Sequence, residues 1–422
     1  MLKKHLIILL LLVSSVGLFA QSIPSGTGRY AALGYNPFIM DAATDINRNP
    51  AWAGMYYNYA FGDIGTAQSS SEGGSDFVLD NQYAGINFHV GKMISLGAVF
   101  NKDESMWSSF NDGNLGGSYR PDSLGVKTPL VPLKVLFSWS NKKLNLGIAP
   151  YYAMWSSDAT SAATGASSED KRSSYEIGGT IGIISHMNNN SWIEGDVNFK
   201  MDKYKKEVSS TGVPTVTYDN TGGIELGATV RGWFLASKPS KINIVPYVGF
   251  SMFNWTPEVS GTTVPNPDVS NFSLNGGIGI NMPIFDQGML AGGISTGISN
   301  YKYTRNDSLG YSFKVNTFTL PQFNIGLEWN FTEWLIGRTG YSRSIMNTKF
   351  EAAETGLDQT YTESMPSNPD QTITLGLGWS FGRFSLDGLI GEKFFQRAPY
   401  IVSGHPTDLY GVLSASYNFN KK

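Results

Sequence analysis

The sequence predicts an all-β fold, a transmembrane antiparallel β-barrel of fourteen to sixteen strands with an N-terminal, partly helical hatch inside it. The main observation is an alternation of apolar with small or polar residues, clearest from Gly411 to Phe419, where Leu413, Ala415 and Tyr417 share one face. The strands are joined alternately by short turns and long polar loops, and the chain begins with an export signal. Together these features are typical of outer-membrane barrels.

The export signal is predicted at residues 1–20. Lys3 and Lys4 supply a positive start, and Leu6 to Val13 form a short apolar core. Such a core cannot span a bilayer, which takes about 20 apolar residues. Cleavage is predicted after Ala20, so the mature chain is expected to begin at Gln21.

The next segment, residues 21–55, does not alternate and is predicted to be the hatch. Asn36-Pro37 favours a helix from Phe38 to Asn47, because Asn accepts from free helical amides and Pro fits the first turn. Asn49-Pro50 repeats the device before a short turn through Ala51, Trp52 and Ala53. Two interpretations of this second corner stay open: a hinge or latch of the hatch, or a cap that steers the chain into the first strand.

The barrel is predicted over residues 56–422. Each of its strands has one apolar face. The expected strands are 56–64, 82–90, 93–102, 133–140, 143–155, 173–186, 190–204, 222–234, 241–254, 271–282, 288–302, 316–331, 334–347, 371–381, 384–396 and 408–419.

The connections between these strands alternate in length. Short turns are expected at Gly91-Lys92, Asn141-Lys142, Met187 to Asn189, Ala236 to Ser240, Pro283 to Gln287, Thr332-Glu333 and Gly382-Arg383. Long polar loops are expected at Thr66–Asn81, Asp103–Pro132, Ser156–Arg172, Pro257–Pro267 and Lys349–Asp370. A soluble β-sandwich or propeller also has many strands but does not need every second loop to be long.

Composition agrees with a membrane barrel and narrows the function. Charged residues make up 15% of the chain, below the roughly 25% of ordinary soluble domains. A net charge of −3 gives no reason to expect nucleic acid, and the absence of Cys excludes disulfides and thiol chemistry. His89, His186 and His405 lie far apart and outside any metal-binding or catalytic spacing. We therefore expect no enzyme, no metal and no cofactor.

Charged residues on the polar faces of the predicted strands are expected to face the lumen, because an Arg or Lys facing lipid costs about 2–4 kcal/mol at mid-membrane and an acidic side chain costs less, though still some, free energy. They are Glu176, Glu194, Asp196, Glu225, Arg231, Glu328 and Asp387. They would line a conduit or hold the hatch through ion pairs with Arg29 or Arg48. The simpler interpretation, which we favour from sequence alone, is that they hydrate the lumen or pair across it.

A family resemblance lies in the predicted hatch. The stretches Gly28 to Gly34 (GRYAALG), Asp41 to Asp45 (DAATD) and Asn49-Pro50-Ala51 resemble the N-terminal signature of the FadL-type outer-membrane transporters and their PorV-like relatives. The hatch residues implied by this resemblance are Arg29, Asp41, Asp45, Asn49, Pro50 and Ala51. Two features depart from the family: Tyr35 to Met40 separates the motifs, and the strand count exceeds the fourteen that the family implies.

The resemblance implies a barrel in the cell outer membrane, closed by its hatch. FadL-type members pass hydrophobic small molecules without an energy source, and PorV-like members act with the type IX secretion machinery. Passive transport of hydrophobic or small molecules is the expected function. A protein-binding component of a secretion or surface-attachment system and a purely structural barrel are the alternatives. The expected partners are outer-membrane lipids, a hydrophobic small-molecule ligand or a secretion protein.

Overall fold

The computed structural model describes residues 28–66, 83–100, 121–163, 166–188, 190–260, 267–285, 287–305, 311–354, 359–367, 371–390 and 410–420. The predicted signal at residues 1–20 lies outside them. Within these ranges, no helix has both the length and the apolar character needed to cross a membrane.

Among the described residues, seventeen strands follow three short helical elements. Sixteen of them overlap the sixteen strands predicted from alternation, and β14 was not predicted. The strands are β1 (Tyr59–Thr66), β2 (Tyr83–Val90), β3 (Ile94–Phe100), β4 (Leu130–Ser140), β5 (Leu144–Ala163), β6 (Ala166–Asn188), β7 (Ser191–Ser210), β8 (Val213–Ser237), β9 (Ile242–Val259), β10 (Pro267–Ile284), β11 (Gly288–Arg305), β12 (Tyr311–Asn330), β13 (Leu335–Glu354), β14 (Gln359–Ser367), β15 (Gln371–Phe381), β16 (Phe384–Ile390) and β17 (Tyr410–Asn418).

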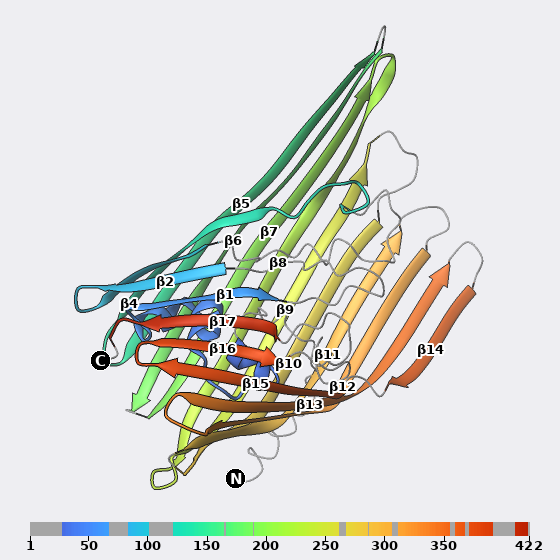
Figure 1. Cartoon of the computed structure of the whole chain (residues 1–422). Coiled ribbons are helices and arrows are strands. Elements are labelled where there is room, and N and C mark those ends of the chain that lie inside the picture. The colour runs from blue at the N-terminus through green and yellow to red at the C-terminus, as the bar shows by residue number, and fades with distance from the viewer. Residues whose placement is uncertain are drawn as a thin grey trace, which may run out of the picture.

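The strands form one closed antiparallel barrel (Figure 1). Each strand pairs with the next along the chain except at β14, and β17 returns to β1, where Tyr59 lies opposite Asn418. Strand β13 pairs with β15 over residues 335–343 and with β14 over residues 346–354, so β14 and β15 occupy one place in the wall. The ring therefore has sixteen places, which confirms the predicted fold and the upper limit of its strand number.

The two ends of the barrel differ. At one end, here the turn end, residues 91–93, 141–143, 238–241, 331–334 and 382–383 join successive strands, as predicted. The other end, the loop end, carries the long connections from β1 to β2, from β3 to β4 and from β16 to β17, whereas β5–β6 and β7–β8 are joined there by short ones. At the top of Figure 1, β5 to β8 project at the loop end well beyond the shorter strands β1, β16 and β17.

This projection corrects the predicted loops. Ser156–Arg172 is not a loop: β5 and β6 stay paired up to Ala163 opposite Ala166. Lys349–Asp370 likewise contains the end of β13 and all of β14, and Pro257 and Pro267 lie in β9 and β10. These hairpin ends carry polar residues on both faces, as at Lys171 opposite Glu207 on one face and Arg172 opposite Lys206 on the other, so apolar alternation cannot detect them. Residues 67–81 of the first predicted loop and 103–120 of the second lie outside the described residues.

The outer face of the barrel is apolar. On β6, Ile177, Ile181 and Ile183 are exposed by 42%, 63% and 43%, while the intervening Thr180 and Ile184 are buried. Strands β10 and β12 repeat this pattern with exposed Ile278 and Ile325. So large an apolar surface would be unfavourable in water and indicates contact with lipid.

The N-terminal helices lie inside the barrel, behind β1, β16 and β17 in Figure 1. They are α2 (Gly28–Ala32), α3 (Ala42–Arg48) and the 3-10 helix η1 (Pro50–Gly54). We call residues 28–57 the inner segment. Helix η1 contacts β3 to β6, and α2 contacts β13 and β15 to β17. The inner segment therefore touches both sides of the barrel wall.

One helix begins later than predicted. The expected helix at Phe38 starts only at Ala42, capped by the Asp41 side chain, which accepts from Thr44 N–H at 3.0 Å. Asn36 instead caps a turn by accepting from Phe38 N–H at 2.9 Å. The second corner does form as predicted, with Asn49 capping η1 and Pro50 in its first turn. Helix α2 was not predicted from sequence.

Candidate functional site

The inner segment lies very close to the backbone of the barrel wall. Asn49 and Pro50 lie so near Gly147 and Gly182 that a Cβ at either glycine would overlap them. Asn49 also donates from its amide to the carbonyls of Ile183 and Gly195, at 3.4 and 3.3 Å. The corner is therefore both a helix cap and a bond between the inner segment and the wall.

A first ion cluster joins α3 to strands β7 and β8. Arg48 of α3 lies 2.7 Å from Glu194, and Arg231 lies 2.7 Å from Asp45. Arg231 also pairs with Glu194, and the Trp52 indole N–H donates to the same carboxylate. Arg231, Asp45 and Glu194 are at most 4% exposed, so their charges are neutralised by one another rather than by water.

A second ion cluster joins the start of the inner segment to the opposite wall. Arg29 of α2 lies 2.8 Å from Glu328 of β12 and 3.4 Å from Asp41. Arg338 of β13 bridges Glu328 to Asp387 of β16, at 2.6 Å from each carboxylate. The two clusters thus join the inner segment to five strands of the barrel: β7 and β8 at one point, and β12, β13 and β16 at the other.

Both arginines of the inner segment keep their charge. Burial favours the neutral guanidinium, but the carboxylates outweigh this effect, chiefly Glu328 for Arg29 and Glu194 for Arg48, and raise the pKa of each arginine above its ordinary value. Since a buried charge left without its partner costs about 3–5 kcal/mol, each cluster acts as a unit.

The remaining predicted site residues lie apart from these clusters or at their edge. Glu176 is fully buried and accepts from the Tyr151 hydroxyl. Asp196 is buried beside Arg48, and Glu225 accepts from the Asn198 amide at 3.3 Å. Among the hatch residues, Ala51 is fully buried in η1.

Sequence reasoning missed three groups that complete the site. Arg338, Trp52 and Lys134 all lie against the inner segment or its charged partners, and Lys134 donates to the Asn47 carbonyl at 3.3 Å. Arg338 was detectable, because it lies in a predicted strand on the same face as the lumen charges and directly opposite Glu328. Nothing in the local sequence indicates that Trp52 reaches Glu194.

A second feature, the aromatic cluster, lies on the lumen side nearer the loop end. Its buried residues are Tyr204, Phe253, Trp255, Val269 and Tyr303, together with Leu124 and Val126, and Trp155, Tyr218, Tyr301 and Phe313 pack around them. The aromatic members alternate with outward-facing neighbours along β5, β7 to β9, β11 and β12, and β10 contributes Val269. The lumen is therefore apolar at a level where water-filled barrels are polar.

Residues 121–128, the inward segment, fold from the loop end into this cluster. Leu124 and Val126 are 7% and 2% exposed. The Ser174 hydroxyl donates to the Lys127 carbonyl at 2.7 Å, and Arg172 donates to the Gly125 carbonyl at 3.4 Å. These residues lay within the predicted loop Asp103–Pro132, whose inward course no local pattern could reveal.

The comparisons with known proteins concern the fold. No protein-family model and no curated protein matches the chain. Among solved structures, the toluene transporter TodX of Pseudomonas putida is similar over 96% of this chain and 100% of its own, with 11% identity and a TM-score of 0.42. The monoaromatic hydrocarbon channel CymD is similar over 95% of this chain and 99% of its own, with 10% identity and a TM-score of 0.37. Both are FadL-family barrels, the family that the hatch motif resembles. The ferric yersiniabactin receptor FyuA of Yersinia pestis follows over 80% and 70%, at 9% identity and a TM-score of 0.34.

No cluster of three or more metal-ligating side chains occurs within the described ranges.

Proposed function

We propose that this chain is an outer-membrane channel through which small hydrophobic molecules enter the cell by diffusion. The apolar outer face supports an outer-membrane barrel. The short turns at one end and the longest connections at the other support a turn end in the periplasm and a loop end outside. The export signal predicted at residues 1–20 is consistent with this location.

The observation that carries the proposal is the aromatic cluster in the lumen. A channel for ions or sugars needs water and polar groups along its path, whereas aromatic rings bind apolar molecules after water is displaced. Tyr204 and Trp255 lie edge to face at 6.3 Å, and both are nearly fully buried. The cluster therefore has the chemistry of a binding site for apolar or aromatic molecules entering from outside.

In this proposal, two parts of the chain close the path. Leu124 and Val126 of the inward segment occupy the aromatic cluster from the outside. The inner segment acts as the hatch, held across the lumen by the two ion clusters. A hydrophobic molecule would displace the inward segment first and then pass where the inner segment loosens from the wall.

The test is uptake of a radiolabelled aromatic hydrocarbon by Gram-negative cells that lack their own hydrophobic-compound channel and carry this barrel. The double variant Phe253→Ala/Trp255→Ala removes two rings from the cluster, and we expect it to lower uptake about ten-fold, because each ring contributes apolar contact area.

Phe250→Ala is the matched control. Phe250 lies on the same strand but faces outward, against the ring of Phe272 at 5.6 Å. Hydrocarbon uptake by cells carrying Phe250→Ala should equal uptake by cells carrying the unaltered protein. Equal uptake by the cluster variant and the control, at equal amounts of folded barrel, would contradict the proposal.

A second candidate function, protein binding at the cell surface, is favoured by the projection of β5 to β8. The outer ends of these strands are hydrophilic and charged. The ion pairs Lys171–Glu169 and Lys205–Glu207 are exposed there on the neighbouring strands β6 and β7. Removing residues 157–171 and 206–216 would shorten both hairpins while keeping the barrel wall. If the shortened barrel loses a stoichiometric surface protein but retains hydrocarbon uptake, the projection binds a partner; if it loses none, this second function is excluded.

A further inference from the structure

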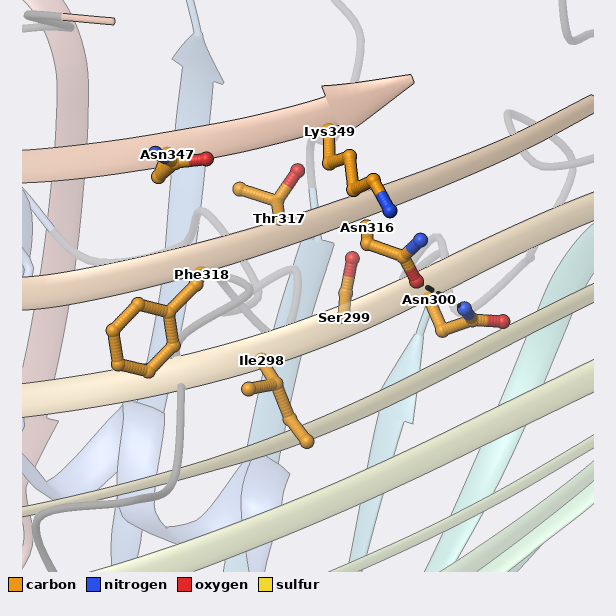
Figure 2. A pocket seen from close by; sticks show the side chains of 8 residues that line it. All are labelled: Ile298, Ser299, Asn300, Asn316, Thr317, Phe318, Asn347 and Lys349. Atoms are coloured by element: carbon orange, nitrogen blue, oxygen red, sulfur yellow. Dashed lines mark hydrogen bonds between the residues drawn. The ribbon is translucent and has the colours of Figure 1, made fainter. Parts of the chain in front are cut away.

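The outer wall of β11, β12 and β13 has a depression of 370 Å³ near the loop end (Figure 2). Its outward-facing residues form rows across the three strands. The lower row is Ile298, Phe318 and Asn347, and the next row toward the loop end is Asn300, Asn316 and Lys349. Figure 2 shows the apolar pair Ile298 and Phe318 on one side and the polar groups around Lys349 on the other.

The row above adds positive charge without matching negative charge. Lys302 lies directly opposite Lys314, which lies opposite Glu351. Glu351 lies 2.6 Å from Lys349 and 4.0 Å from Lys314. Lys302 has no ion-pair partner in the described part of the chain. Two lysines therefore share the carboxylate of Glu351, and Lys302 adds a third positive charge beside them.

Two lysines opposite each other destabilise a strand pair unless an anion lies between them. The pair lies where the apolar band ends: on β12, the outward-facing Ile325, Phe323 and Leu320 are exposed by 48%, 38% and 46% below it. A ligand at this place would contact lipid-facing rings with one part and ammonium groups with the other.

We propose that this surface, the outer-wall site, binds a phosphorylated acyl lipid of the outer leaflet. Its phosphate lies between Lys302 and Lys314, and the amides of Asn300 and Asn316, which are hydrogen-bonded to each other, border the headgroup. An acyl chain runs over Ile298 and Phe318 toward the apolar band. The charge of the three lysines and the apolar floor fit such a lipid better than a soluble anion, which would leave the floor uncovered.

The inference rests on the outer-membrane location proposed above but not on transport. The test is native mass spectrometry of the full barrel in detergent, titrated with didecanoyl phosphatidic acid. We expect Lys302→Gln/Lys314→Gln to weaken binding about ten-fold, because each lysine near an anionic lipid attracts it substantially. Lys302→Gln alone, which removes the cation without an ion pair, should weaken binding about three-fold and guards against misfolding of the double variant.

Lys238→Gln/Lys241→Gln in the β8–β9 turn removes the same charge at the opposite end, where both residues are exposed, and should leave binding unchanged. Three results would overturn the assignment: equal affinity of the site variant and this control, equal binding of didecanoylglycerol without phosphate, or full competition by inorganic phosphate at the same concentration. This experiment measures lipid binding and not uptake. A barrel that binds the lipid but takes up no hydrocarbon would therefore contradict the proposed channel and leave the lipid site supported.

Discussion

At the scale of single residues, the site depends on which inward charges meet across the lumen. Alternation along the strands predicts that Glu194, Glu328 and Asp387 face the lumen. It does not predict which charged side chains on other strands lie close enough to pair with them. The pairing of Glu328 with Arg338 and with Arg29 depends on the register of β12 and β13 and on the path of α2. These are properties of the closed barrel, and a local pattern does not contain them.

The residue whose loss should matter most is Glu194, because it compensates both Arg48 and Arg231 and accepts from Trp52. Glu194→Gln keeps the shape and removes the charge. We expect it to lower the free energy of unfolding in urea by about 3 kcal/mol or more, since two buried arginines lose a counter-charge.

Glu225→Gln is the matched comparison on the next strand. Glu225 also faces the lumen, where it accepts a hydrogen bond from the Asn198 amide at 3.3 Å. Its replacement should lower the free energy of unfolding by less than about 1 kcal/mol. Equal losses for the two variants would mean that the first ion cluster does not stabilise the barrel beyond ordinary polar contacts.

At the scale of elements, the inner segment is fixed by close approach as much as by charge. The cap signals at Asp41 and Asn49 can be read from sequence, since their side chains act on neighbouring amides. The position of the inner segment against the wall cannot, because it requires small residues on strands far along the chain. Gly147 and Gly182 are such residues, and they face η1.

Gly182→Ala is expected to displace the corner at Asn49 and Pro50, because the new Cβ would overlap the Asn49 side chain and lie 3.1 Å from Pro50 Cδ. We expect faster leakage of a small hydrophilic dye from liposomes that contain the reconstituted barrel, with the barrel still folded.

Gly195→Ala is the control for this change. It lies on the adjacent strand, yet its new Cβ would have no neighbour nearer than 3.6 Å. The rate of dye leakage from liposomes with the Gly195→Ala barrel should equal the rate with the unaltered barrel. If Gly182→Ala leaks no faster than Gly195→Ala, the corner does not seal the lumen.

At the scale of the whole molecule, the barrel was predictable because each membrane-crossing strand must present an apolar face to lipid. Strand β15 was predicted with the bounds it has, and β11 with all but its last three residues, for this reason. The apolar alternation that predicts the strands ends where the barrel wall leaves the membrane. The ends of β5 to β8 continue as water-exposed ladders, and the inward segment packs by long-range contacts with β7 and β9 to β11.

In the proposed function, the inner segment must move for hydrophobic molecules to pass. The chain has no Cys, so two introduced cysteines have only each other as partners. Leu33 and Gly326 suit a cross-link from the inner segment to β12, because a Cβ at Gly326 would lie 3.3 Å from Leu33 Cβ, close to the spacing of a disulfide.

The most direct measurement is uptake of the labelled aromatic hydrocarbon by cells carrying Leu33→Cys/Gly326→Cys, before and after reduction of the disulfide. Each single cysteine variant serves as the control for the substitutions themselves. The account predicts that the oxidised double variant takes up little hydrocarbon and that reduction restores the rate of the single variants. Undiminished uptake by the fully cross-linked barrel would contradict it, because the inner segment would then not close the path.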